Sequence, residues 1–186
     1  VADGLPRETA DELSKEFTEM NITIGREQGA KNVGYLCAWC AYIAKKYFPQ
    51  DSNLHYFADI PLQRLKEETL SLPRTRVGYY RGCLARAPIF APGALKEFDM
   101  NWSAYREVLD RIDGLEVVDM PNNVCCMQEE KIFKFAKEQG LSTIVTMCLP
   151  CHGRLMRKTP EDIQIIGWPD LMLMAVAHPR KMSLFP

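Results

Sequence analysis

The chain has 186 residues, of which 47% are hydrophobic, and this is enough apolar material for one sizeable core or two small ones. Its 23 basic and 24 acidic side chains give a formal net charge of -1, which argues against a surface that binds nucleic acid or an anionic membrane. No apolar run approaches the roughly 20 residues of a membrane-spanning helix, so the sequence predicts no transmembrane segment.

The first third of the chain predicts a short series of helices and strands. The spacing of apolar residues predicts a helix over 8–20, and a run of β-branched and aromatic residues predicts a strand over 33–36. A helix, a strand and a last helix ending near Glu68 follow. The segment 69–75, which contains Pro73, is the predicted boundary before the next part of the chain.

The remainder of the chain predicts strands that alternate with helices. Strands are expected over 76–80, 115–120, 143–147 and 163–168, and helices over 102–112, 128–139, 150–157 and 169–177. Pro150 and Pro169 suit the first turn of a helix, and Gly140 suits a helix end. This alternation predicts an α/β fold with mainly parallel sheets covered on both faces.

The sequence contains an internal repeat. Gly29, Cys37 and Cys40 match Gly140, Cys148 and Cys151 without a gap, and Pro61 matches Pro169 after a three-residue deletion. We therefore expect two tandem pseudo-repeats of strand–helix units. Residues 1–72 would be a truncated first repeat, and residues 73–186 a complete second one.

The cysteines are the strongest chemical feature of the sequence. There are seven of them, an odd number, and two CxxC pairs, which favours thiolate ligands in a reducing compartment over a framework of disulfides. We therefore expect a cytoplasmic protein. Cys83 follows the first strand of the second repeat, Cys125 and Cys126 follow the next, and Cys148 and Cys151 follow the third, so all five are expected at one sheet edge.

Thiolate sulfur is the ligand that iron–sulfur clusters and zinc prefer, and a helix start favours thiolate over thiol. Five sulfurs exceed the four ligands of a tetrahedral zinc site, so an iron–sulfur cluster uses the set more fully, with zinc as the alternative. A third interpretation is that these residues are ordinary buried core cysteines.

The segments YYRGCLAR, NNVCC and IVTMCLPCHGRL resemble the cysteine-rich CCG domain of the heterodisulfide reductase family. The same domain occurs in glycolate oxidase iron–sulfur subunits and related succinate or fumarate reductase subunits. The resemblance implies that two CCG-type domains stand in tandem. It also implies that Cys83, Cys125, Cys126, Cys148 and Cys151 hold a noncubane 4Fe-4S cluster at which a disulfide is reduced.

Two departures from the family pattern favour a different role. Met127 stands where the family motif has glycine, and the segment between Cys126 and Cys148 is shorter than in the family. Half of the ligand set is absent from the first repeat, where Cys37 and Cys40 are interpreted as a structural or vestigial pair, or as ligands completed by another subunit. His152, next to Cys151, is the candidate catalytic proton donor, or alternatively a partly exposed histidine at a helix start.

These observations lead to two functional hypotheses. The first is an iron–sulfur electron-transfer subunit of an oxidoreductase complex that reduces a disulfide at the cluster and takes a disulfide or a thiol as its substrate. Its partners would be a flavin or iron–sulfur subunit that donates electrons, with attachment to a membrane complex through such partners. The second is a non-catalytic scaffold subunit of a larger redox assembly, stabilised by zinc or a cluster.

Overall fold

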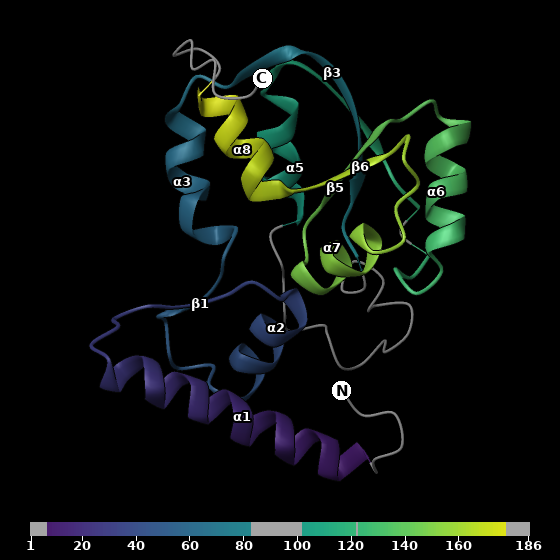
Figure 1. The fold of residues 1–186 in the computed structure, drawn as a ribbon. Helices are drawn as coiled ribbons and strands as arrows, with labels where there is room; N and C mark the ends of the chain where they lie inside the picture. Colours follow the sequence, from purple (N-terminus) through teal and green to yellow (C-terminus); the bar gives the residue numbers. More distant parts are fainter. Residues whose placement is uncertain (1–6, 83–101, 122, 178–186) are drawn as a thin grey trace. The chain divides into compact units, whose positions relative to one another are not determined.

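The structure is a computed structural model that describes residues 7–82, 102–121 and 123–177 (Figure 1). It divides into two compact units, Val1–Ile60 (unit 1) and Pro61–Pro186 (unit 2). Helices alternate with strands in both units, and every strand pairing within the described ranges is parallel. The predicted α/β class with parallel sheets is therefore confirmed.

Unit 1 is built on one pair of short parallel strands. Its elements are α1 (Arg7–Glu27), β1 (Val33–Tyr35), α2 (Ala38–Tyr47) and β2 (Leu54–Tyr56), and α3 (Asp59–Glu67) begins at its end. The helix predicted over 8–20 continues to Glu27, because its hydrogen-bonded turns are first interrupted at Gly29, whose φ is +80°. There the amide of Ala30 donates to the carbonyl of Gly25 at 2.9 Å, which closes the helix.

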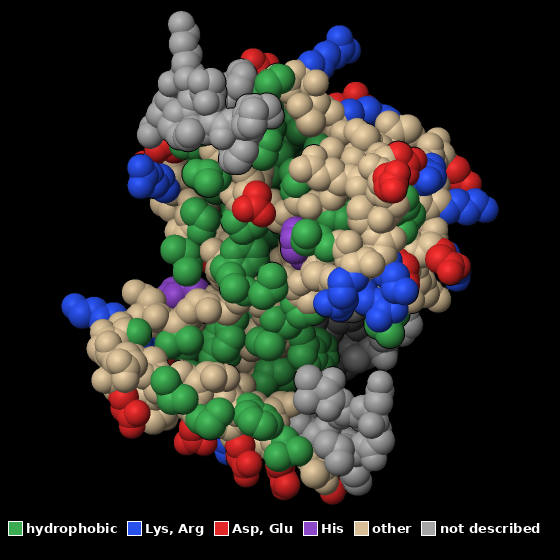
Figure 2. Space-filling model, viewed as in Figure 1, with side chains coloured by type: hydrophobic (Ala, Val, Ile, Leu, Met, Phe, Trp, Pro, Cys, Tyr) green, Lys and Arg blue, Asp and Glu red, His purple; other side chains and the backbone are tan. Residues whose placement is uncertain are grey.

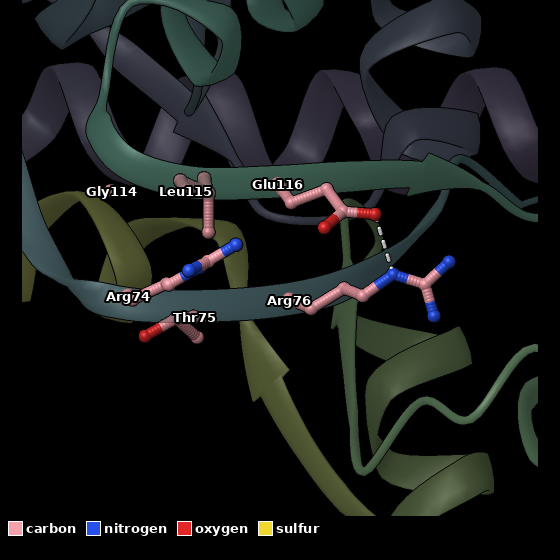
Figure 3. A pocket seen from close by; sticks show the side chains of 6 residues that line it. All are labelled: Arg74, Thr75, Arg76, Gly114, Leu115 and Glu116. Carbon is pink, nitrogen blue, oxygen red and sulfur yellow. Dashed lines mark hydrogen bonds and ion pairs between the residues drawn. The ribbon is translucent and has the colours of Figure 1, made fainter.

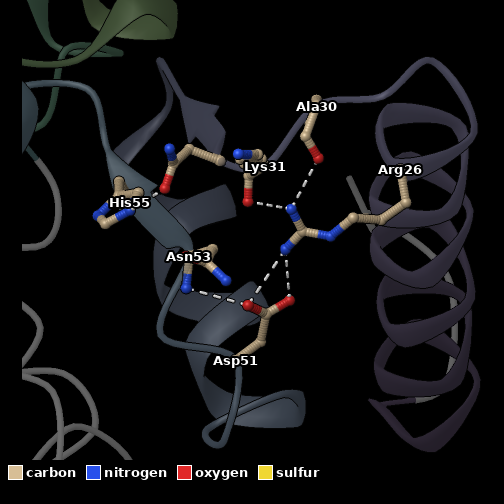
Figure 4. A network of polar contacts seen from close by, with 7 residues as sticks. Arg26, Ala30, Lys31, Asp51, Asn53 and His55 are labelled. Atoms are coloured by element: carbon tan, nitrogen blue, oxygen red, sulfur yellow. Dashed lines mark hydrogen bonds and ion pairs between the residues drawn. The ribbon is translucent and has the colours of Figure 1, made fainter.

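A polar network fastens the end of α1 to the segment before β2 (Figure 4). The Arg26 guanidinium donates to both carboxylate oxygens of Asp51, at 3.0 and 3.2 Å, and to the carbonyls of Ala30 and Lys31. Asp51 also accepts from the amide of Asn53, which together with Arg26 lowers the pKa of its carboxyl. These contacts are those of a structural network that holds a helix end to a loop.

Unit 2 is a four-stranded parallel sheet in the order β4-β3-β5-β6. Its further elements are β3 (Ser71–Tyr80), α5 (Trp102–Asp110), β4 (Asp113–Asp119), α6 (Glu129–Glu138), β5 (Thr143–Thr146), α7 (Leu149–Met156), β6 (Gln164–Gly167) and α8 (Trp168–Ala177). The chain passes from β3 to β4 on one side and then to β5 on the other, so the strand order reverses at β3. Loops at the carboxyl ends of strands diverge at such a point, and ligands of open α/β sheets bind there.

Helices cover both faces of this sheet (Figure 1). Buried side chains of α6 and α7 join Tyr80, Ile144 and Ile165 in one hydrophobic cluster on one face. On the other face α5 meets α8 through Tyr105 and Trp168, whose ring centroids are 6.1 Å apart, and α8 packs against β3, β5 and β6. Burial on both faces accounts for the apolar runs at the end of β3 and in β5, whereas β4 at the sheet edge has no fully buried residue.

β3 begins at Ser71, within the segment 69–75 that the sequence suggests as the boundary between the repeats. The division into compact units lies between Ile60 and Pro61. The register with β4 is interrupted between Ser71 and Thr75, and this irregularity accommodates Pro73, which has no amide hydrogen to donate. Gly114, with φ of +82°, lies against the Leu72 carbonyl at the same place.

An open pocket of about 530 Å³ lies beside this irregularity (Figure 3). Its lining comes from the amino-terminal halves of β3 and β4, where Arg76 Nε donates to a Glu116 carboxylate oxygen at 2.6 Å. The cysteines of unit 2 follow the carboxyl ends of the strands, so this pocket belongs to the opposite end of the sheet.

The two units contain a comparable strand–CxxC–helix–strand segment. Val33 pairs with Leu54 in unit 1, and Ile144 pairs with Ile165 in unit 2. Cys37 and Cys148 each cap the following helix with extended backbone angles. Both CxxC pairs are therefore held in the first turn of a helix that follows a parallel strand.

Candidate functional site

The described cysteines of unit 2 lie in two loops that follow parallel strands. Cys125 and Cys126 come after β4 in a turn closed by a hydrogen bond from the Gln128 amide to the Cys125 carbonyl at 2.8 Å. Cys148 comes after β5 and caps α7, and Cys151 lies in the first turn of that helix. We call Cys125, Cys126, Cys148 and Cys151 the cysteine edge of the sheet.

The cysteine edge is part of the apolar core. Cys126 and Cys151 belong to the same buried cluster as the side chains of α6, with 9% and 3% of their surface exposed, and Cys125 and Cys148 pack against this cluster. The side chains of Cys126 and Cys151 are therefore largely shielded from water. The two loops thus each contribute one cysteine to the cluster and one that packs against it.

Gly82 links the end of β3 to this edge. Its φ is +85°, and a Cβ built on it would come within 3.1 Å of the Cys151 sulfur and 3.8 Å of the Cys148 Cβ. The main chain leaving β3 therefore passes directly against the second CxxC pair. Cys83 is the next residue and lies outside the described residues, so the structure gives it no position.

Tyr80 fixes the loop that carries the first two cysteines of the edge. Its side chain is buried in the cluster, and its hydroxyl donates to the carbonyl of Val124 at 3.0 Å. The Met147 amide donates to the Tyr80 carbonyl at 3.3 Å, which ties the end of β5 to the same residue. Sequence reasoning missed both Tyr80 and Gly82, although their position immediately before Cys83 was the available signal.

His152 is held by a buried hydroxyl. Its Nδ1 lies 3.1 Å from Thr146 Oγ1, and that hydroxyl also lies 3.3 Å from the Ile166 carbonyl, to which it donates. Because Thr146 has only one hydroxyl hydrogen, the pairing favours the tautomer in which Nδ1 carries the hydrogen and Nε2 is the basic nitrogen. The sequence did not single out Thr146.

An ion pair joins the two helices that flank the cysteine edge. Arg154 of α7 lies 3.4 Å from a Glu129 carboxylate oxygen at the start of α6. The amide of Glu129 itself, at this helix start, lowers the pKa of its carboxyl, and the Arg154 charge adds to the effect.

Met127, which precedes α6, has 62% of its side chain exposed. Its side chain therefore does not fill the core beside Cys126.

The first CxxC pair lies in unit 1. Cys37 caps α2 and is half-buried, and Cys40 lies one turn onward and is exposed. Across both units, no three His, Cys, Asp or Glu side chains within the described ranges form a group that could hold a metal ion. Nor do the described helices include one long and apolar enough to cross a bilayer.

Comparison with known proteins finds no family model and no curated protein that matches this sequence. Among solved structures, the chain is similar to a Yersinia pestis protein described as a "putative Asp/Glu Racemase". The TM-score is 0.38 and the sequence identity 14%, over 92% of this chain and 74% of that chain. A likeness at this level assigns no activity to the chain.

These findings correct the family prediction. The resemblance to the heterodisulfide reductase family and its CCG domain is wrong, because no family model matches the chain. The function predicted from that resemblance is therefore wrong too, both as an iron–sulfur electron-transfer subunit of an oxidoreductase and as a scaffold subunit of a redox assembly, and the described residues contain no group of three or more metal-ligating side chains. Short cysteine motifs recur by themselves in unrelated folds, and this is why they misled the assignment.

Proposed function

We propose that the cysteine edge is a ligand site for a thiophilic metal centre, either an iron–sulfur cluster or a zinc ion. Its ligands are Cys125, Cys126, Cys148 and Cys151, with Cys83 as the fifth. The contact of Gly82 with Cys151 carries this proposal, because it brings the end of β3 to the CxxC pair of α7 and Cys83 is the next residue in the sequence. Three loops at the switch point of the sheet then supply sulfur to one place.

The chemistry of the donor set fits such a centre. Thiolate is the ligand that zinc and iron–sulfur clusters prefer, and Cys148 and Cys151 lie at a helix N-terminus, which favours the ionised form. An isolated thiolate in an apolar cluster is costly, so a bound cation stabilises it there. The described sulfurs do not yet form a group of three, and ligation therefore requires Cys83 and a small movement of the loop before α6.

His152 is the side chain that we assign to proton transfer at this site. The Thr146 hydroxyl holds Nδ1, which leaves Nε2 as the nitrogen available for proton transfer. Thiolate ligation releases a proton from each cysteine, so a neighbouring base assists loading of the site.

We also infer that the protein works in a reducing compartment, the cytoplasm. Its partners would be molecules that present a thiol or a disulfide, or further subunits that dock on the chain.

The experiment is a metal analysis of the whole chain, purified without oxygen. Iron, acid-labile sulfide and zinc are measured per chain, first as purified and then after exposure to ferrous iron with sulfide or to zinc alone. The C126S/C151S double variant is the test, and C37S/C40S is its matched control in the other unit. We expect bound metal in the wild type and in the control, with loss of most of it in C126S/C151S.

The two forms of the proposal give different results. Iron with equimolar sulfide identifies a cluster, and one zinc without iron identifies a zinc site. A wild-type chain that binds neither, or a C126S/C151S variant that retains the metal, would overturn the proposal. The cysteines would then be core residues, and the circular dichroism of the variants shows whether each has folded.

A further inference from the structure

The first CxxC pair, Cys37 and Cys40, is not used by the proposed site and has a different setting from the second. Both pairs begin a helix after a parallel strand. Cys40, however, is exposed, whereas its counterpart Cys151 has only 3% of its surface exposed. The same backbone arrangement thus exposes the second cysteine of one pair and buries that of the other, whereas the first cysteines, Cys37 and Cys148, are both half-buried.

The backbone of this pair suits a disulfide. Cys37 is the residue that caps α2, with φ of -95° and ψ of 122°, and Cys40 lies in the first turn of the same helix. Helical geometry places α-carbons three residues apart at about 5 Å, which is within the span that a disulfide bridges. A bond between the two sulfurs therefore closes without unwinding α2.

The surroundings favour a reactive thiolate. The pair lies at the N-terminus of α2, a ten-residue helix with no acidic side chain in its first turn and with Lys45 and Lys46 in its last. The helix dipole lowers the pKa of thiols at such a position. The side chains of Leu36 and Trp39, which are neighbours of the cysteines in the sequence, are exposed and apolar. Figure 2 shows that other apolar side chains also reach the surface.

Tyr35 adds a polar group to the same place. Its hydroxyl is buried and has no hydrogen-bond partner within the described part of the chain. Burial raises the pKa of this phenol, and the negative charge of a Cys40 thiolate raises it further, so the hydroxyl keeps its hydrogen. The structure shows no hydrogen bond from this hydroxyl to the Cys40 sulfur, and the role that we assign to it is donation to that sulfur when the sulfur is ionised.

We propose that Cys37 and Cys40 form a reversible disulfide, so that unit 1 is a dithiol that exchanges with external disulfides. The exposed Cys40 is the sulfur that attacks, and the half-buried Cys37 is the one that resolves the mixed disulfide. Tyr35 is a positioning residue that stabilises the Cys40 thiolate. This inference does not depend on the metal site proposed in unit 2.

The exchange balances in two steps. The Cys40 thiolate attacks one sulfur of an external disulfide, forming a mixed disulfide and releasing the other sulfur as a thiolate, which takes up a proton. Cys37 loses its proton and attacks the Cys40 sulfur, which forms the Cys37–Cys40 bond and releases the second external thiolate. The cysteine pair is oxidised by two electrons, and the external disulfide is reduced to two thiols.

The experiment is a redox titration of the whole chain. Samples are equilibrated without oxygen in mixtures of reduced and oxidised glutathione, quenched with acid, alkylated, digested and analysed by mass spectrometry. We expect the peptide that contains residues 37–40 to lose two hydrogen atoms in a single transition. The Cys148 and Cys151 peptide should remain alkylated over the same range, because Cys151 is buried.

Single variants separate the roles of the two sulfurs. C37S should accumulate a glutathione adduct on Cys40 several-fold faster than C40S accumulates one on Cys37. Y35F should move the transition toward the oxidised pair, because it removes a donor that stabilises the reduced thiolate. M127A, at an exposed side chain of unit 2, is the control and should leave the transition unchanged.

Two results would overturn the inference. One is recovery of Cys37 and Cys40 as fully alkylated thiols even in pure oxidised glutathione, in a chain whose circular dichroism is native. The other is a disulfide that joins either residue to a cysteine elsewhere in the chain, since this would show that the pair does not act as a unit.

Discussion

Gly82 and Cys151 are in direct contact: a Cβ on Gly82 would come within 3.1 Å of the Cys151 sulfur. The contact joins the end of β3, the strand at which the sheet order reverses, to the first turn of α7. Gly82 also has a φ of +85°, a conformation that residues with a side chain rarely adopt. Two separate physical requirements thus select glycine at the position before Cys83.

Gly82→Ala should therefore destabilise unit 2 more than a glycine replacement that adds strain alone. Gly140→Ala is the matched control, because Gly140 has φ of +64° and only the end of the Arg76 side chain, at 4.0 Å, near its added Cβ. We expect a loss of about 1 kcal/mol for Gly140→Ala and about 2–3 kcal/mol for Gly82→Ala, measured by urea unfolding. Equal losses would contradict the close contact with Cys151.

Tyr79 and Tyr80 are neighbours, but we expect their replacement by phenylalanine to affect the free energy of unfolding differently. Tyr80→Phe removes the hydrogen bond to the Val124 carbonyl and should cost about 1 kcal/mol of unfolding free energy. Tyr79→Phe removes a buried hydroxyl that has no partner within the described residues, so we expect no loss or a small gain. Alkylation of Cys125 should become faster only in Tyr80→Phe, and an equal rate in both variants would show that Tyr80 does not fix the loop.

Thr146 should control the tautomer of His152. Thr146→Val removes the hydroxyl that contacts Nδ1 and the Ile166 carbonyl, and should cost about 1–2 kcal/mol because both groups lose their partner. Thr146→Ser keeps the hydroxyl and is the control. Nitrogen chemical shifts should place the hydrogen on Nδ1 in the wild type and in the serine variant, and a wild type with the hydrogen on Nε2 would contradict the assignment.

Glu129 should contribute stability that is lost in acid. Its pKa in the folded chain lies below the ordinary value of 4.5, so folding favours the ionised carboxylate. This contribution is fully present above the pKa of the unfolded chain and disappears as the pH falls through the lower folded pKa. Glu129→Gln should therefore be less stable than the wild type at pH 7, with a smaller difference below about pH 4, in urea unfolding at each pH. If the wild type and Glu129→Gln differed in unfolding free energy by the same amount at both pH values, the lowered pKa of Glu129 would be contradicted.

Much of the fold could be predicted from local pattern. The four strands of unit 2 lie within a few residues of their predicted positions, because buried parallel strands give unbroken β-branched runs. The exceptions have local causes. The helix predicted to end at 20 continues until Gly29 interrupts it, and the strand predicted over 76–80 already begins at Ser71, since a register irregularity tolerates Pro73 there.

The candidate site could be predicted only in part. The order of the cysteines along the chain placed them after three successive strands, and in the structure four of them share one cluster. The family assigned from the same motifs was wrong, because a motif of a few cysteines specifies ligand chemistry and not ancestry. Thr146, Tyr80 and Gly82 were missed because their partners lie on other strands and helices.

The α/β class and the strand–helix order follow from the sequence alone, since hydrophobic periodicity is a local property that each segment carries independently. The sequence alone also predicts that each CxxC pair lies at the start of a helix. That Gly82 lies against Cys151, and that Cys151 is buried while Cys40 is exposed, became known only from the folded chain. Contact and burial depend on which strands become neighbours, and packing of the whole sheet sets that arrangement.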